Sequence, residues 1–342
     1  MSSASKIIRA SSFPRAGLIG NPSDGFHGKT IAFIVRNFQA DVTLWESPEL
    51  VIEPNQRDHT SFASITKLLE SIDAFGYYGG LRLLQASVRR FHGYCKKNGS
   101  PIHSRNFTVR YQSNIPSHVG LAGSSAIITA CFRALMLFYD VTIPAPVLAN
   151  LVLSVENEEL RIPAGLQDRV IQAHEGLVFM DFAQEHFEHK GYGSYEELDI
   201  SLLPSLYIAY RTTLSEGTEI FHNDIRTRFN RQEPKIMAAL DEWANLAQQT
   251  RDLLVAGKGN QIGPLLDRNF DLRSQTYQLS SGNLAMIEAA RAVGASAKFT
   301  GSGGAIVGTY EGEEMFSKLK GVLELQGCKV FKPQIAPDST YT

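Results

Sequence analysis

A glycine- and serine-rich loop runs directly into an apolar helical pattern near the middle of this chain. The loop covers residues 116–126 (PSHVGLAGSSA), and the helical pattern follows over 127–139. Small residues let backbone N–H groups approach an anion closely, and the start of a helix adds unpaired N–H groups and the positive end of its dipole. A serine that only caps an ordinary helix would give a similar sequence. The loop therefore indicates either a phosphate site or a capped turn.

Strand-like and helical segments are mixed along the chain without a regular repeat. Enrichment in β-branched and aromatic residues predicts strands over 30–45, 107–111, 177–182, 206–211 and 306–310, with a last one near 328–335. Apolar periodicity predicts helices over 61–75, 79–98, 127–139, 145–160, 234–256, 260–279, 283–293 and 313–326. This order favours a two-lobe α+β fold over a doubly wound sheet. The polar segment 183–204 places a domain boundary near residue 190, giving domains 1–190 and 191–342.

Charge and composition exclude several classes of function. The formal net charge of −2 gives no electrostatic basis for binding nucleic acid. No apolar run is long enough for a membrane span or a secretion signal, so a cytoplasmic protein without a membrane partner is expected. Cys95, Cys131 and Cys328 lie far apart, without the spacing of a metal site or a disulfide framework.

Two further glycine motifs flank the central loop, and each resembles a better-known one. Gly28-Lys29-Thr30 ends like a P-loop, but the required first glycine is replaced by Ser23 and a strand-like segment follows, so we exclude that interpretation. The turn before it then presents Arg15 and Asp24, unless it is an ordinary surface turn. The glycine run at 301–304 has the wrong spacing for dinucleotide binding, and a simple turn would also account for it.

Two carboxylates, Glu156 and Asp168, lie twelve positions apart across a predicted helix end and loop. Most exposed carboxylates are only solvated charges, but the residues around Asp168 are mostly apolar. Phosphoryl transfer needs a metal ligand and a group that accepts or orients the hydroxyl proton. This pair could supply both.

The three glycine loops, in this order and at these separations, resemble the motifs of the GHMP kinase superfamily. The first motif of that family, Pro-Gly-Arg-x-x-Leu-Ile-Gly-Glu-x-x-Asp, matches at Arg15, Leu18, Ile19, Gly20 and Asp24. The second matches 116–126 with one extra residue, and the third matches 298–304. The extra residue in the second motif, and the segment AGLQD at 164–168, resemble features of the sugar-kinase branch of this superfamily. Segments spread over nearly the whole length are most similar to the plant-type glucuronokinases.

The resemblance implies a fold, a reaction and a set of small-molecule partners. The expected fold has an N-terminal lobe like ribosomal S5 domain 2 and a ferredoxin-like C-terminal lobe. The expected reaction transfers a phosphoryl group from ATP, with Mg2+, to the anomeric hydroxyl of D-glucuronate, and its product feeds UDP-glucuronate synthesis. Alternatives are a fucose, heptose phosphate or galacturonate kinase of the same superfamily, or a non-catalytic sugar sensor.

Roles for individual residues also follow from the resemblance. Asp168 is the expected base, and Arg15 neutralises charge near the transferred phosphate and keeps Asp168 ionised. Ser124 and Glu156 are the expected magnesium ligands, and Asp24 bonds sugar hydroxyls. The ATP-binding residues are Pro116, Gly120, Leu121, Ala122, Gly123, Ser124, Ser125 and Ala126. The residues expected to close on the substrate are Thr300, Gly301, Ser302, Gly303 and Gly304.

One departure from the family pattern bears on the substrate. Asn21 stands where the family has a glutamate, and the loss of that negative charge suits an anionic substrate. A uronate carboxylate also needs a partner, for which arginine is the usual solution. The candidates near the motifs are Arg161, Arg169, Arg211 and Lys29, and each could equally be an ordinary surface charge.

Overall fold

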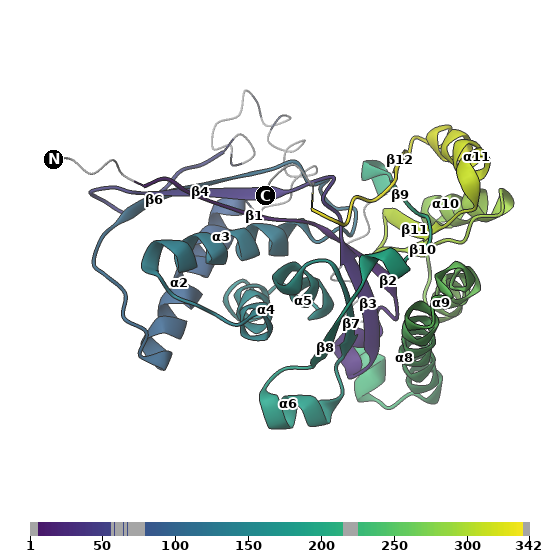
Figure 1. Cartoon of the computed structure of the whole chain (residues 1–342), viewed down its shortest axis with the longest axis horizontal. Helices are drawn as coiled ribbons and strands as arrows, with labels where there is room; N and C mark the ends of the chain where they lie inside the picture. The colour runs from purple at the N-terminus through teal and green to yellow at the C-terminus, as the bar shows by residue number, and fades with distance from the viewer. Residues whose placement is uncertain are drawn as a thin grey trace.

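Three four-stranded sheets with helices packed around them make up the computed structural model of the chain (Figure 1). The structure describes residues 6–55, 58, 64, 67, 79–214 and 225–337. The helix predicted over 61–75 lies almost wholly outside these residues. The mixture of helices and mostly antiparallel sheets confirms the α+β prediction.

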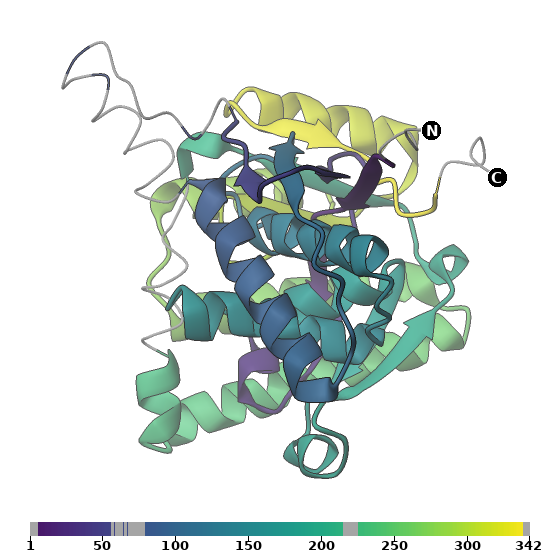
Figure 2. The same ribbon diagram turned by 90° about the vertical axis from the view of Figure 1, so that its left-hand side faces the viewer.

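The first sheet supports the helix that follows the central loop. Its strands, in spatial order, are β1 (Ile8–Ser12), β4 (Ala40–Glu46), β6 (Phe107–Ser113) and β5 (Val51–Ile52). Helix α3 (Gly123–Tyr139) packs on β1 and β4, and α2 (Gly80–Asn98) packs against α3. Figure 2 shows α2 in blue, in front of these elements. Because α3 packs on the sheet on one side and on α2 on another, most of its apolar residues are buried.

The second sheet lies between two layers of helices. Its order is β2 (Arg15–Ile19), β3 (Lys29–Ile34), β7 (Leu177–Asp181) and β8 (Ser194–Leu198). Ala32 and Ile34 of β3 pack toward α4 (Ala145–Ser154) and α5 (Gln167–His174). Ile31 and Phe33 pack toward α8 (Pro234–Val255) on the other face. Both faces of β3 are therefore apolar. Because Lys29 begins this strand and no helix follows it, the exclusion of a P-loop is confirmed.

The third sheet carries the last glycine motif. Its order is β10 (Lys298–Phe299), β11 (Ala305–Thr309), β9 (Leu206–Tyr210) and β12 (Lys329–Phe331), all antiparallel. The helices around it are α9 (Gly263–Thr276), α10 (Ser281–Ala292) and α11 (Gly312–Glu324). The segment after β12 returns to the N-terminal half, where the Arg36 N–H donates to the Gln334 carbonyl over 2.7 Å.

The chain between the two predicted domains completes the second sheet. Residue 190 ends α6 (Gln184–Lys190), and β8 then pairs with β7 along its length. Buried apolar residues of α8 pack in one hydrophobic cluster with those of β2 and β3. The division at residue 190 thus falls before the last strand of the second sheet, and the two-domain division stays a prediction. None of the helices in the described part of the chain is long and apolar enough to span a membrane.

Candidate active site

Loops from all three sheets line a cavity of about 500 Å³. The predicted site residues that line it are Arg15, Asp24, Pro116, Gly120, Leu121, Ala122, Gly123, Ser124, Ser125, Glu156, Asp168, Gly301 and Ser302. The structure thus brings the three glycine motifs and the acidic pair to one place. The predicted residues that are buried and do not line the cavity are Ala126, Thr300, Gly303 and Gly304.

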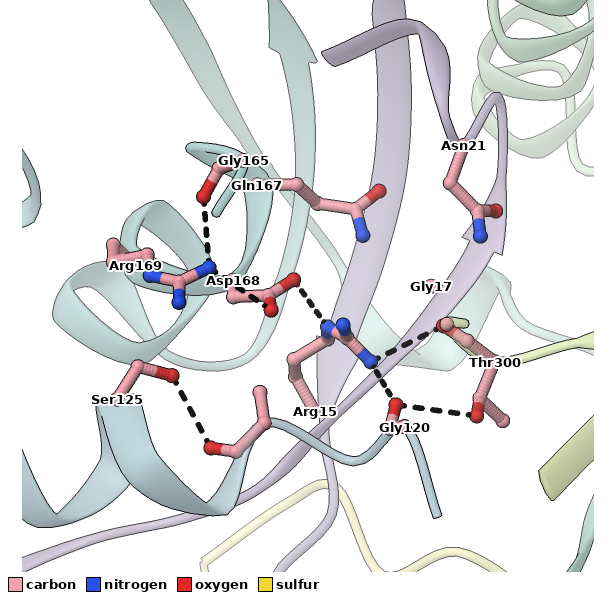
Figure 3. A network of polar contacts seen from close by, with 12 residues as sticks. Arg15, Gly17, Asn21, Gly120, Ser125, Gly165, Gln167, Asp168, Arg169 and Thr300 are labelled. Carbon is pink, nitrogen blue, oxygen red and sulfur yellow. Dashed lines mark hydrogen bonds and ion pairs between the residues drawn. The ribbon is translucent and has the colours of Figure 1, made fainter. Parts of the chain in front are cut away.

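Arg15, at the start of β2, connects the three motifs (Figure 3). Its Nε donates to Asp168 Oδ1 over 2.6 Å. Its Nη1 donates to the Gly120 carbonyl over 2.5 Å and to the Thr300 carbonyl over 3.2 Å. The side chain is buried, so these bonds form with little competition from water. One guanidinium therefore holds the carboxylate and both glycine loops in a fixed geometry.

Asp168 lies in the first turn of α5, and both of its carboxylate oxygens are bound. Oδ1 accepts from Arg15, and Oδ2 accepts from Arg169 Nη1 over 3.1 Å. Arg169 Nη1 also donates to the Gly165 carbonyl over 2.8 Å, at the base of the same loop. The start of a helix favours a negative charge, and two cations add to this effect. The carboxylate is thus oriented and charge-compensated at the wall of the cavity.

Glu156 lies in a π-helical turn, Val155–Glu159, that follows α4. Such turns occur often at functional sites because they displace one side chain from the helical pattern. Glu156 is buried, and its Oε2 accepts from Arg169 Nε over 2.7 Å and also from Nη2. Burial raises the pKa of Glu156, while the Arg169 guanidinium opposes that shift. Arg169 therefore connects the predicted magnesium ligand Glu156 with the predicted base Asp168.

Ser124 and Glu156 both present an oxygen at the cavity. Ser124 is exposed in the first turn of α3, and Glu156 Oε1 takes no part in the Arg169 pair. The described residues contain no group of three or more acidic, histidine or cysteine side chains that could hold a metal by themselves. Magnesium is commonly held by one or two protein oxygens together with substrate phosphates, and these two residues fit that pattern.

The two glycine loops touch each other at Gly120 and Gly301. Gly120 has a left-handed backbone (φ +68°), and a Cβ on Gly301 would lie 2.4 Å from the Gly120 carbonyl oxygen. Only glycine allows this approach without a shift of the backbone. Ala122 also has a left-handed backbone, with φ 61° and ψ 47°, immediately before α3. Its carbonyl accepts from Ser125 Oγ over 3.2 Å and from Gln172 Nε2 over 2.9 Å.

Asp24, in the turn after β2, is half-buried near Asp168. Its Oδ2 accepts a long hydrogen bond of 3.3 Å from the Gln167 backbone N–H. Desolvation by burial, followed by repulsion from Asp168, raises the pKa of Asp24 from 3.8 to about 6. Asp24 therefore faces the cavity as a carboxylate whose charge is poorly compensated, which suits a group that binds hydroxyl hydrogens.

Two residues that hold the last glycine loop in place belong to no sequence motif. Arg273 on α9 donates to the Gly301 and Ser302 carbonyls over 2.8 Å each. Asn283 on α10 accepts from the Gly304 N–H over 3.0 Å. Neither residue belongs to a motif, and each lies on a helix that precedes the loop it holds. Nothing in their sequence context would have singled them out.

The four candidate partners for a uronate carboxylate lie in different places. Arg169 lines the cavity but is committed to Glu156 and Asp168. Lys29 pairs with Asp181, and Arg211 bonds Thr213. Arg161 is exposed and, like Lys29 and Arg211, does not line the cavity.

Comparison with known proteins agrees with this geometry. Residues 83–176 match the model of the GHMP kinases N-terminal domain. "Probable glucuronokinase 2" of Arabidopsis thaliana is 44% identical over 88% of this chain and 84% of its own length. "Glucuronokinase 1" of the same plant is 43% identical over 89% and 85%.

Solved structures of low sequence identity share the fold. Galactokinase of Lactococcus lactis, complexed with galactose, has a TM-score of 0.73 at 16% identity and covers 96% of this chain and 94% of its own. Mevalonate kinase of Methanococcus jannaschii has a TM-score of 0.70 at 17% identity, with coverage of 98% and 100%. The family model and the Arabidopsis relatives, which are 43–44% identical over most of the chain, show that the chain belongs to the GHMP kinase family.

Proposed function

We propose that this protein is a sugar 1-kinase that transfers the γ-phosphoryl group of ATP to the anomeric hydroxyl of D-glucuronate. The observation that carries the proposal is Asp168, held on both oxygens by arginines beside two glycine loops in one cavity. The substrate is taken from the Arabidopsis glucuronokinases, which align with most of the chain. The products are ADP and D-glucuronate 1-phosphate.

The loop before α3 is the proposed site for the ATP phosphates. Its glycines allow close approach of the backbone, and the first turn of α3 offers N–H groups and a positive dipole end. The apolar cavity wall formed by Leu83, Ile115 and Ile127 offers a surface for the nucleotide base. Binding both substrates in one cavity converts the transfer into a reaction between neighbours, which supplies much of the catalysis in kinases.

Asp168 is the proposed acceptor of the proton from the anomeric hydroxyl. Its fixed orientation lets one oxygen face the hydroxyl without a change of rotamer. Arg15 lies beside it and adds positive charge where negative charge develops during transfer. Asp24 is placed to accept hydrogen bonds from sugar hydroxyls. The 300–304 turn, held by Arg273, closes the other side of the site.

Ser124 and Glu156 are the proposed protein ligands of Mg2+, which would compensate the charge of the ATP phosphates when bound. The role of Arg169 is then to keep the Glu156 carboxylate ionised in a buried position, so that it can serve as a ligand. We also propose that the enzyme acts in the cytoplasm and that its product enters UDP-glucuronate synthesis.

The test is an ADP-release assay with purified protein, ATP and magnesium. Glucuronate, galacturonate, galactose, fucose and mevalonate are each supplied in turn. We expect release to depend on glucuronate and to be weaker with the others. ADP release that depends on another of these compounds, with none on glucuronate, would refute the proposed substrate while leaving the kinase assignment intact.

A further inference from the structure

The ammonium group of Lys298 is buried behind the cavity wall without a carboxylate partner in the described structure. Its Nζ donates to the Gly17 carbonyl over 2.7 Å, to Asn21 Oδ1 over 2.6 Å and to the Phe299 carbonyl over 2.8 Å. Three neutral acceptors use all three N–H groups. Burial, with repulsion from Arg273 and Arg15, lowers the pKa of Lys298 well below its usual value. The protonated form of Lys298 is therefore poorly stabilised without an anion nearby, and a carboxylate bound at this end of the cavity would favour it.

Lys298 fixes the orientation of the Asn21 side chain. An ammonium group only donates hydrogen bonds, so the atom of Asn21 that faces it must be the oxygen. The Nδ2 amide group then faces away from Lys298, and Asn21 lines the cavity. Figure 3 shows the nitrogen of the Asn21 amide on the side of Gly17, with the Gln167 amide to its left in this view. Asn21 thus presents N–H donors to the cavity, with a cation behind them.

Gln167 places a second amide beside Asn21. A Cβ on Gly17 would lie 3.1 Å from Gln167 Nε2 and 3.4 Å from Asn21 Cγ, so the two side chains lie close together over Gly17. Gln167 is 2% exposed, and its Oε1 has no hydrogen-bond partner. A buried amide without a partner is costly in a folded protein. Because an ionised carboxylate only accepts hydrogen bonds, it can bind the Nε2 group of Gln167, whereas the unpartnered Oε1 needs a donor, which a hydroxyl of the same sugar can supply.

The position of this amide pair matches the shape of a uronate. In a pyranose ring, the anomeric carbon and the carbon that carries the carboxylate both flank the ring oxygen. A carboxylate subsite must therefore lie close to the residue that meets the anomeric hydroxyl. Gln167 precedes Asp168 directly, at the start of α5, and both line the cavity.

We propose that the amides of Asn21 and Gln167, with the Lys298 ammonium behind Asn21, form the subsite for the carboxylate of the sugar acid. The inference rests on the proposed function and adds the residues that select an anionic sugar. The amides supply the hydrogen bonds, and the Lys298 ammonium, which has three neutral acceptors and no carboxylate partner among the described residues, favours a carboxylate over a neutral group. Asn21 and Gln167 are binding residues here, and Lys298 acts through Asn21 as a positioning residue.

The test compares D-glucuronate with D-glucuronamide, which has the same ring but an uncharged carboxamide. Asn21→Asp gives Lys298 an acidic partner. The new negative charge also repels the carboxylate of the substrate. Like charges at this distance cost several kcal/mol, so kcat/KM for glucuronate is expected to fall about 100-fold. The value for glucuronamide is expected to change by less than about tenfold, and the KM for ATP by less than about threefold, because neither involves that pair of charges.

Gln249→Glu, on the exposed face of α8, is the matched control for an amide-to-carboxylate change. It should leave both sugars unaffected. Retained glucuronate selectivity in Asn21→Asp, or an equal loss for both sugars, overturns the inference. If thermal unfolding shows that Asn21→Asp is not folded, Gln167→Met takes its place. It removes one donor without adding charge and must raise the KM for glucuronate more than that for glucuronamide.

The failure of the proposed function would look different. If the unaltered protein releases no ADP with glucuronate, the reaction assignment fails. Titration calorimetry with glucuronate alone still tests the subsite in that case. Binding that Asn21→Asp weakens supports the subsite, and binding that is absent or unchanged by the substitution refutes it.

Discussion

Replacing Asp24 with asparagine is expected to stabilise the protein while damaging its activity. The folded structure raises the pKa of Asp24 from 3.8 to about 6, so keeping this carboxylate ionised costs folding free energy at neutral pH. The shift corresponds to about 3 kcal/mol as an upper bound. Asp24 is only half-buried, and water screens part of the effect, so roughly 1–2 kcal/mol is the expected gain. Asparagine has nearly the same shape and can still accept from the Gln167 N–H.

The pH dependence of this gain follows from the direction of the shift. The folded state holds a proton on Asp24 between about pH 4 and pH 6, where the unfolded chain has released it. The stability that this group contributes is therefore complete below about pH 4 and lost as the pH rises through about 6. The advantage of Asp24→Asn should be near zero at pH 4 and reach its full value at pH 7.

The assay is thermal unfolding of the protein without substrates, followed at several pH values. At pH 7 the variant should melt roughly 1.5–3 °C higher than the unaltered protein. Asp241→Asn, at an exposed position of α8, is the control and should show no such difference. A stability difference that is the same at pH 4 and pH 7 would refute the reasoning. In turnover, kcat/KM for the sugar should fall about 10- to 100-fold, since a charged hydrogen-bond acceptor is lost.

Three further substitutions test other parts of the site. Asp168→Asn should lower kcat about 100- to 10,000-fold with little change in the KM for ATP, and a variant that keeps more than about a tenth of the rate would contradict its role as proton acceptor. Arg169→Met leaves the buried Glu156 carboxylate unpaired and should lower the free energy of unfolding by about 3–5 kcal/mol, measured with denaturant. The double variant with Glu156→Leu should recover most of this loss. An Arg169→Met protein as stable as the unaltered one would show that the pair is not needed for stability. Ala122→Gly relieves a left-handed backbone and should add about 1 kcal/mol to the unfolding free energy, so an unchanged or lower melting temperature would be inconsistent with strain there.

Sequence patterns predicted those parts of the molecule that depend on local chemistry. The loop at 116–126 and the helix after it follow from small residues and an apolar run, and the structure has both. The sequence of β3 does not alternate between apolar and polar residues, because helices cover both faces of this strand. Such a strand has no two-residue period from which its buried face could be predicted. The predicted helix over 145–160 is present, but its last turn is π-helical, a change of one hydrogen-bond register that propensity does not encode.

Contacts between distant parts of the chain were not predictable in this way. Lys298 and Asn21 are 277 positions apart, and Arg273 reaches Gly301 from a separate helix. Such pairs depend on how whole sheets and helices are placed, which local patterns do not report. The sequence predicts Glu156 as a metal ligand, but its pairing with Arg169, 13 positions away, depends on how the π-helical turn and α5 pack together.

Arg15 explains why three motifs so far apart must occur together. Its guanidinium donates hydrogen bonds to the carbonyl groups of Gly120 and Thr300, which are 105 and 285 positions away in the sequence. In a trans peptide the C=O and N–H groups point in opposite directions, so the N–H groups of Leu121 and Gly301 are turned away from the guanidinium. Neither N–H has a hydrogen-bond partner among the described residues. By binding the two carbonyl groups, Arg15 leaves these two N–H groups facing away from it, where they can donate to an acceptor such as a phosphate oxygen.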